Sequence, residues 1–128
     1  MASGGRLLLS FGGAQGASTK KAYASSNPIL FPYVIRSITT LFHPGHAGLV
    51  QVSYFIGSTN SVSTDTQPEG QPVLSGLGNL DYLVDTEPVT IIMELDVRTA
   101  PTYLKMYINN TSADIQPSTY GLITIEAL

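Results

Sequence analysis

The stretch of sequence that decides the fold runs from Val34 to Ile56 and reads VIRSITTLF (34–42), HPGHAG (43–48) and LVQVSYFI (49–56). Its last part alternates, so that one face carries Val50, Val52, Tyr54 and Ile56. A period of two is typical of a β-strand with one buried face. The first part is rich in β-branched residues, which suit a pleated sheet, and the Pro and Gly residues between them reverse the chain. We therefore predict a β-hairpin over these residues.

Further strands are predicted on the C-terminal side of this hairpin. After Pro88, the alternation over 89–97 is the clearest in the chain, and a turn at 98–101 leads to a second alternating run over 102–109. We expect these two runs to pair, which would place Lys105 opposite Glu94 or Asp96. Residues 71–83 contain glycines and predict one or two short strands, and 118–128 predicts the last strand.

These strands define a fold class. Seven or eight strands are separated by Gly, Pro, Asn and Asp turns, and no amphipathic helix is visible. A chain of 128 residues is one domain that can bury a core without disulfides, and it has no cysteine. We predict an all-β, single-domain antiparallel β-sandwich that is jelly-roll-like, with an immunoglobulin-like arrangement as the alternative.

The first 26 residues differ from the rest because they are rich in Gly, Ala and Ser, the composition of a flexible segment. We expect residues 1–26 to form an extended N-terminal arm and 27–128 to form the sandwich domain. The arm holds a short apolar cluster, too short for the core of a signal peptide. Partner contacts are expected from this cluster and from the two lysines of the arm, namely Leu7, Leu8, Leu9, Phe11, Lys20 and Lys21.

The number and distribution of charged residues argue against some classes of function. Charged residues make up 12% of the chain, against roughly 25% in ordinary soluble domains. From Val34 onward there are nine acidic and three basic side chains, which argues against nucleic-acid binding. A basic arm on an acidic body indicates that the arm lies on an acidic neighbour. No apolar run approaches the roughly 20 residues of a membrane span.

Candidate catalytic and metal-binding groups are few. His43 and His46 are the only histidines; they could share a metal, but we expect them to be solvent-exposed turn residues, since no third ligand is near in sequence. No cysteine is present and no serine lies in a G-x-S-x-G motif, so we predict that the protein is not an enzyme and needs no cofactor.

Two other features are candidate binding elements. Asp81, Asp85 and Glu87 could form a weak Ca²⁺ site, although an acidic solvated turn is the simpler interpretation. Tyr103 and Tyr107 lie four residues apart on one predicted strand, where they form an outward aromatic patch suited to a protein interface or to stacking on sugars. The long polar loop 57–70 is either a partner-contacting loop or a mobile excursion.

A Gly/Ala-rich arm with one apolar anchor, a charge-poor sandwich with the segment FHPGHAGLV, and an abrupt end in TIEAL resemble accessory virion proteins of tailed bacteriophages, the head-decoration or minor structural class. The resemblance implies a β-rich structural protein of the virion that forms homo-oligomers, trimers above all, and binds a capsid shell. The alternative is an extracellular, lectin-like carbohydrate-binding module that uses the loops at one end.

Overall fold

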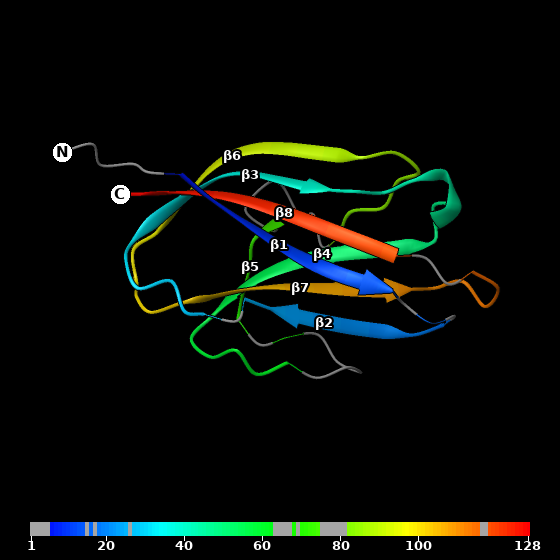
Figure 1. Ribbon diagram of the computed structural model, residues 1–128, viewed down its shortest axis with the longest axis horizontal. Helices are drawn as coiled ribbons and strands as arrows, with labels where there is room; N and C mark the ends of the chain where they lie inside the picture. The colour runs from blue at the N-terminus through cyan, green and yellow to red at the C-terminus, as the bar shows by residue number, and fades with distance from the viewer. Residues whose placement is uncertain are drawn as a thin grey trace.

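The computed structural model describes residues 6–14, 16, 18–25, 27–62, 68, 70–74, 82–115 and 118–128. These residues form two antiparallel four-stranded sheets that pack against each other (Figure 1), which confirms the predicted all-β sandwich. Apart from the 3₁₀ turn η1 (Pro44–His46), the named elements are β1 (Arg6–Ala14), β2 (Lys20–Ala24), β3 (Tyr33–Thr40), β4 (Val50–Gly57), β5 (Gln71–Pro72), β6 (Val89–Val97), β7 (Tyr103–Asn110) and β8 (Ser118–Ala127).

The strands are divided between a sheet A, in the order β1-β8-β3-β6, and a sheet B, in the order β2-β7-β4-β5. Successive strands therefore lie in different sheets almost throughout, and the chain crosses the core between them. Only β4 and β5 are neighbours both in sequence and in a sheet. The edges of sheet A are β1 and β6, and the edges of sheet B are β2 and β5.

The predicted hairpin over residues 34–56 is wrong in its pairing, although both of its strands exist. β3 pairs with β6 and β8, whereas β4 pairs with β5 and β7. The turn between them explains the difference: after η1, Ala47 and Gly48 both have positive φ, 53° and 69°. The chain thereby passes to the other sheet, so the apolar faces of β3 and β4 meet across the core. The predicted inward face of β4 is confirmed, because Val50, Val52, Tyr54 and Ile56 all belong to the core. Burial itself does not alternate, since Ser53 and Phe55 on the other face are buried as well.

The expected pairing of 89–97 with 102–109 is wrong for the same reason. β6 lies in sheet A and β7 in sheet B. Lys105 is consequently far from its predicted partners: its Nζ donates to the backbone oxygen of Ser61 at 3.1 Å, while Glu94 pairs with Arg36. Alternation shows which face of a strand is buried, but two strands that bury the same core do not have to share a sheet.

The structure corrects the expected arm, because most of it belongs to the sandwich. β1 pairs with β8 over its whole length, from Arg6 opposite Glu126 to Ala14 opposite Ser118, and β2 pairs with β7. Glycine permits this close packing: at Gly12, where φ is 123°, a Cβ would lie 2.1 Å from the Thr119 oxygen. The boundary proposed at residue 26 thus follows two strands of the sandwich, and residues 1–5 lie outside the described part.

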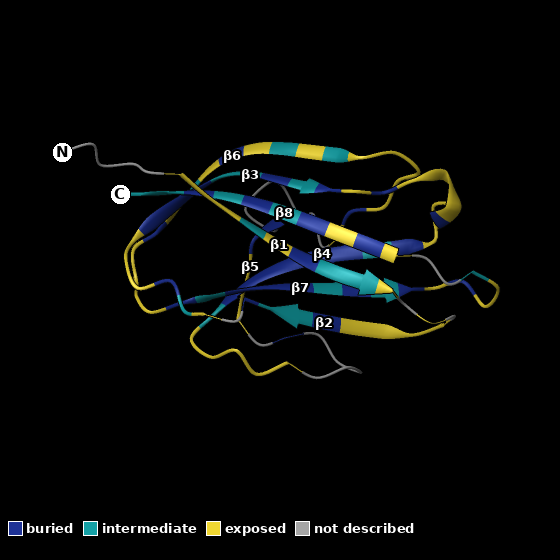
Figure 2. Ribbon diagram, viewed as in Figure 1, coloured by how far each residue is buried: buried dark blue, intermediate teal, exposed yellow. Residues whose placement is uncertain are grey.

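The core lies between the sheets and is formed mainly by β3, β4, β7 and β8 (Figure 2). Two buried tyrosines form hydrogen bonds with threonine hydroxyls: Tyr54 Oη lies 2.7 Å from Thr40 Oγ1, and Tyr33 Oη lies 2.9 Å from Thr102 Oγ1. Burial raises the pKa of both phenols. Tyr54 fits because residue 121 is glycine, where a Cβ would lie 2.3 Å from Tyr54 Oη.

Candidate assembly surface

The two histidines form part of a structural turn. His43 is exposed, as expected, but the same expectation is wrong for His46, which is fully buried. The ring of His46 packs edge-on against Phe42, with ring centroids 5.8 Å apart, and lies 3.8 Å from the ring of His43. The Nδ1 of His43 accepts the amide N–H of Gly45 at 3.1 Å. Both rings therefore contribute to the crossing between β3 and β4.

Hydrogen bonding decides the protonation of His46. The amide N–H of His43 donates to Nδ1 of His46 at 2.8 Å, and Nε2 lies 2.9 Å from Thr119 Oγ1. Nδ1 also lies 3.1 Å from the carbonyl oxygen of His43. Since an amide N–H can only donate, the shorter contact favours the tautomer that carries its proton on Nε2, facing Thr119. Burial lowers the pKa of His46, which favours this neutral form. The imidazole thus ties the turn to the first residues of β8.

The acidic residues considered for Ca²⁺ are only partly described. Asp81 lies outside the described residues. Asp85 and Glu87 are exposed, and Asp85 Oδ1 accepts the N–H groups of Thr86 and Glu87 at 2.6 and 3.2 Å. This is the hydrogen bonding of a local turn. Within the described part of the chain, no group of three or more His, Cys, Asp or Glu side chains is placed to hold a metal.

A hollow of about 570 Å³ lies at one end of the sandwich, between the segments that follow β4 and β6. The described residues that line it offer hydroxyl, amide and backbone groups and carry no ionisable side chain; they include Ser58, Gln71, Thr99 and Thr102. A site of this composition can donate and accept hydrogen bonds, but it contains no general acid or base among those residues.

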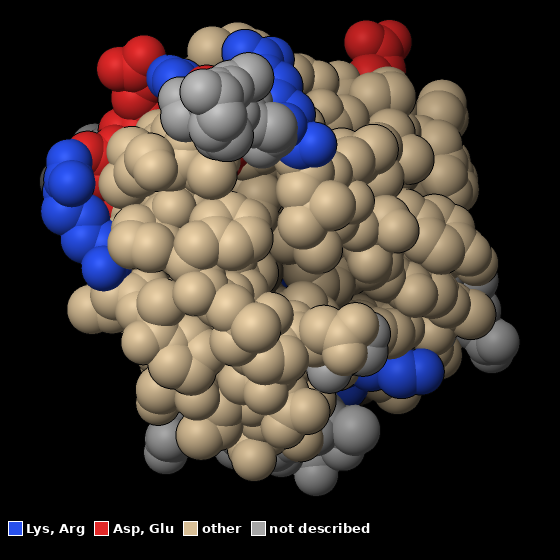
Figure 3. Space-filling view, turned by 60° about the vertical axis from the view of Figure 1, so that its left-hand side comes forward, with Lys and Arg blue, Asp and Glu red and all other residues tan. Residues whose placement is uncertain are grey.

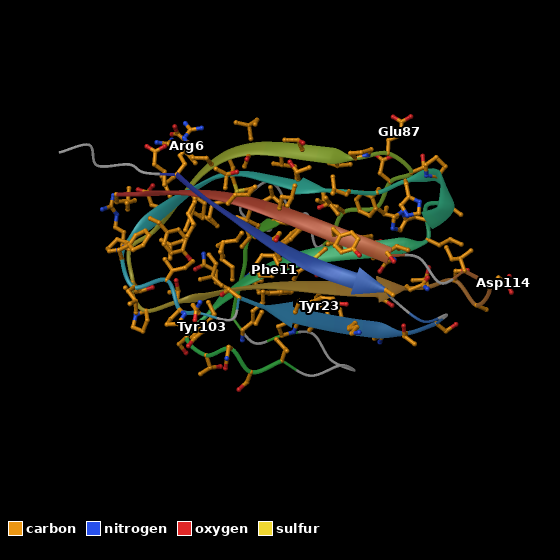
Figure 4. The ribbon with its side chains drawn as sticks, in the orientation of Figure 1. Arg6, Phe11, Tyr23, Glu87, Tyr103 and Asp114 are labelled. Atoms are coloured by element: carbon orange, nitrogen blue, oxygen red, sulfur yellow. The ribbon has the colours of Figure 1, made fainter. Side chains whose placement is uncertain are left out.

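The apolar cluster predicted as a partner anchor is divided between the two faces of β1. Phe11 is buried in the protein's own core, so it is not available to a partner, and Leu9 is partly buried against that core (Figure 4). Leu7 also faces inward, opposite Ile125, but it is about half exposed at the open edge. Leu8 points outward and is 59% exposed. Alternation along β1 accounts for this division.

The other predicted partner residues belong to sheet B. Lys20 and Lys21 are exposed on the edge strand β2, where Lys21 Nζ lies 5.6 Å from the ring centroid of Tyr23. Tyr103 and Tyr107 lie on the outer face of β7, as predicted, but they are partly buried. Between them, the buried Lys105 donates to Ser61, so the described part of the 57–70 loop lies over this face.

The outer face of sheet A differs from that of sheet B, because its central rows carry no charged side chain. One row runs from Leu8 to Thr124, Ser37 and Ile92, and the next runs from Ser10 to Leu122, Thr39 and Thr90. Ile92 is 79% exposed, and Tyr120, further along β8, is 47% exposed. Thr39 and Thr90 hydrogen-bond each other through their hydroxyls at 2.9 Å.

Charged side chains border this face at one end. Glu126 Oε1 lies 3.1 Å from Arg6 Nε and 3.4 Å from Arg36 Nε, and Arg36 Nη1 lies 2.9 Å from Glu94 Oε1. The hydrogen bond from Arg36 is the main reason that the pKa of Glu126 is lowered. The charges of these four side chains alternate in sign across the sheet, from the positive Arg6 on β1 to the negative Glu94 on β6. In Figure 3 most charged atoms lie at the upper left of the view, with a red group at the upper right and a blue one at the lower right, and the surface between them is uncharged.

The partner-contact residues predicted from the sequence do not include three residues of this surface, Ile92, Tyr120 and Leu122. A signal for Ile92 is present, because it is the one apolar residue on a strand face that otherwise carries Thr90, Glu94 and Asp96. An apolar side chain on a polar face that the core does not use indicates a contact with another molecule.

A comparison of the sequence with protein-family models and with curated proteins finds no match. Among the described residues, no helix has the length and apolar character needed to cross a membrane.

Proposed function

We propose that this protein is a structural component of a larger protein assembly, of the capsid-decoration or minor virion kind, and that it joins its neighbours through the outer face of sheet A. The observation that carries the proposal is the uncharged outer face of sheet A, which exposes Leu8 on one edge strand, Ile92 on the other and Tyr120 on β8. The cores of protein interfaces are depleted of charge and enriched in aromatic residues, and exposed apolar patches mark such contacts.

The contrast between the two sheets supports the choice of face. On sheet B, Phe55 and Lys105 point outward yet are buried, and Lys105 donates to Ser61 of the segment that follows β4. On sheet A, the corresponding outward residues of the edge strands stay exposed. A charge-poor face whose edge strands keep their outward side chains exposed is suited to a partner.

The strand order supports a jelly-roll class for the sandwich. The orders β1-β8-β3-β6 and β2-β7-β4-β5 interleave the two halves of the chain, as two intertwined Greek keys do. Jelly rolls occur in viral capsid proteins and also in lectins. A fold does not by itself choose between these functions, so the support for assembly comes from the exposed face.

The test follows the full-length chain in its native source. Extracts are separated by sedimentation, the protein is detected with an antibody, and the fast-sedimenting fractions are imaged by negative-stain electron microscopy. We expect a substantial share of the protein to sediment within large symmetric particles. Sedimentation of all of it as a free chain of 13.6 kDa would contradict the proposal.

Paired variants then test the face. Tyr120→Lys places a charge on the outer face of sheet A and should lower incorporation about tenfold, the effect of losing roughly 1.4 kcal/mol of interface energy. Tyr82→Lys is the matched control, because Tyr82 is 45% exposed and lies outside that face, whereas Tyr120 is 47% exposed. Equal incorporation of the two variants would exclude this face as the contact.

A further inference from the structure

Sheet A ends in two open edges. Within the described residues, no strand pairs with the outer side of β1 or of β6 (Figure 1). A hollow of about 310 Å³ runs beside β1, lined by Ser10, Phe11, Gly12, Tyr23, Ala24 and Tyr120, so β2 does not close that side. Open edges present unpaired backbone N–H and C=O groups, to which another strand can bond.

The two edges have compatible directions. Every neighbouring pair in sheet A is antiparallel, so β1 and β6 run in opposite directions. If a second copy is placed beside the first in the same orientation, its β1 lies antiparallel to β6 of the first copy, and sheet A continues without a change of pattern.

The two edges also match in register. The rows of sheet A that contain Leu8 and Ser10 end at Ile92 and Thr90. If these rows continue into the next copy, Ile92 lies opposite Leu8 and Thr90 lies opposite Ser10. Leu8 and Ile92 are among the most exposed apolar side chains of the described residues, at 59% and 79%. On the inner side of the same pairing, the half-exposed Leu7 would be covered by Met93.

The charges at the ends of the two edge strands are also complementary. Two residues along from Ile92 and Leu8, this register places Glu94 opposite Arg6 of the next copy. Within one copy, Arg6, Glu126, Arg36 and Glu94 already form an alternating row that begins positive at β1 and ends negative at β6. The next copy's Arg6 extends that alternation, and opposite charges across a strand pair stabilise it.

We propose that copies of this chain associate head to tail, with β6 of one copy pairing antiparallel with β1 of the next in the register that joins Ile92 to Leu8 and Glu94 to Arg6. This contact rests on the proposed assembly function and specifies one of its interfaces. A heterologous contact of this kind closes into a ring or extends into a filament.

Pairing of two identical edges is the competing arrangement. A β6–β6 contact centred on Ile92 leaves Glu94 and Asp96 of both copies without basic partners across the contact, and a β1–β1 contact leaves Arg6 of both copies without acidic ones. Head-to-tail pairing brings the two signs together, which is why the charges favour it.

The experiment blocks one edge at a time in the full-length chain. Leu8→Lys blocks β1, Ile92→Lys blocks β6, and Leu30→Lys is the control, since Leu30 is 73% exposed and lies outside both strands. Circular dichroism and thermal unfolding verify that each variant is folded. Sedimentation velocity then measures self-association of each variant and of an equimolar mixture of the two blocked variants.

We expect the wild type and Leu30→Lys to form species larger than dimers as concentration rises. Each blocked variant should associate about 10- to 100-fold more weakly, because one apolar side chain is lost from the contact. The mixture should form a 1:1 dimer and stop there, since one competent edge of each variant remains and the outer edges of the dimer are blocked.

Three results would overturn the pairing: dimers of Ile92→Lys alone, which indicate β1–β1 contacts; dimers of Leu8→Lys alone, which indicate β6–β6 contacts; or a mixture that stays monomeric. A wild type that stays monomeric overturns it as well. The proposed function is judged separately, because incorporation into particles through Tyr120 does not require contacts between copies at these edges.

Discussion

His46 offers the sharpest test of how the sandwich is held together. The change His46→Ala removes a fully buried ring that packs on Phe42 and accepts from the amide of His43. It also leaves that amide and the buried hydroxyl of Thr119 without their partner. Two lost hydrogen bonds cost about 1 kcal/mol each, and the unsatisfied groups and the cavity add to this, so we expect a loss of about 3–5 kcal/mol in the free energy of unfolding.

A loss of this size is a large fraction of the roughly 5–15 kcal/mol that holds a domain folded. Urea denaturation followed by circular dichroism measures it, and the midpoint should fall with an unchanged slope. The control is His43→Ala, which removes the acceptor for the amide of Gly45 and should cost only about 1 kcal/mol. A cost below about 1 kcal/mol for His46→Ala, or equal costs for the two variants, would refute this account of the turn.

Three further predictions concern stability. Burial lowers the pKa of His46 below its usual 6.5, so the unfolded chain binds the proton at a higher pH than the folded chain does. The contribution of His46 to the free energy of unfolding should therefore be fully present above about pH 6.5 and fall as the pH drops toward the folded pKa. Thermal unfolding of His46→Gln should lack this fall. Gly121→Ala should cost about 1–3 kcal/mol in urea denaturation, because the added methyl meets the Tyr54 hydroxyl, and combination with Tyr54→Phe should cost less than the sum of the two. The guanidinium of Arg36 lowers the pKa of Glu126, so the ionised Glu126 stabilises the fold above about pH 4.5, and this stabilisation is lost as the pH falls through the folded pKa. Glu126→Gln should therefore reduce the fall in stability at acid pH. An unchanged fall would contradict the assignment.

Much of the local structure could be predicted because it depends on neighbouring residues alone. The alternation over residues 50–56 and 104–108 predicted the buried faces of β4 and β7, and the structure confirms both. The burial of His46 could not be predicted in this way, because its partner Thr119 is 73 positions away in the chain. The same holds for Phe11, whose Gly-rich surroundings indicate flexibility unless β8 is known to lie beside it.

The sequence predicted partner-contact residues, but it did not indicate the outer face of sheet A. Leu8 was identified from its apolar cluster, whereas Ile92 and Tyr120 were not, since the outer face of sheet A exists only after β1, β8, β3 and β6 are placed side by side. Conversely, the Tyr103 and Tyr107 patch faces outward as predicted, but Ser61 and its neighbours lie over that side of sheet B.

The sequence by itself determined an all-β chain: a period of two in its strands, Gly and Pro turns between them, and too little charge for an ordinary surface. Only the tertiary structure decided which strands are neighbours. The physical reason is that alternation specifies which face of a strand meets the core, while backbone hydrogen bonds between strands are the same for every residue type. Pairing is therefore decided by long-range packing, which joined Arg6–Ala14 to the far end of the chain and turned an expected arm into an edge of sheet A.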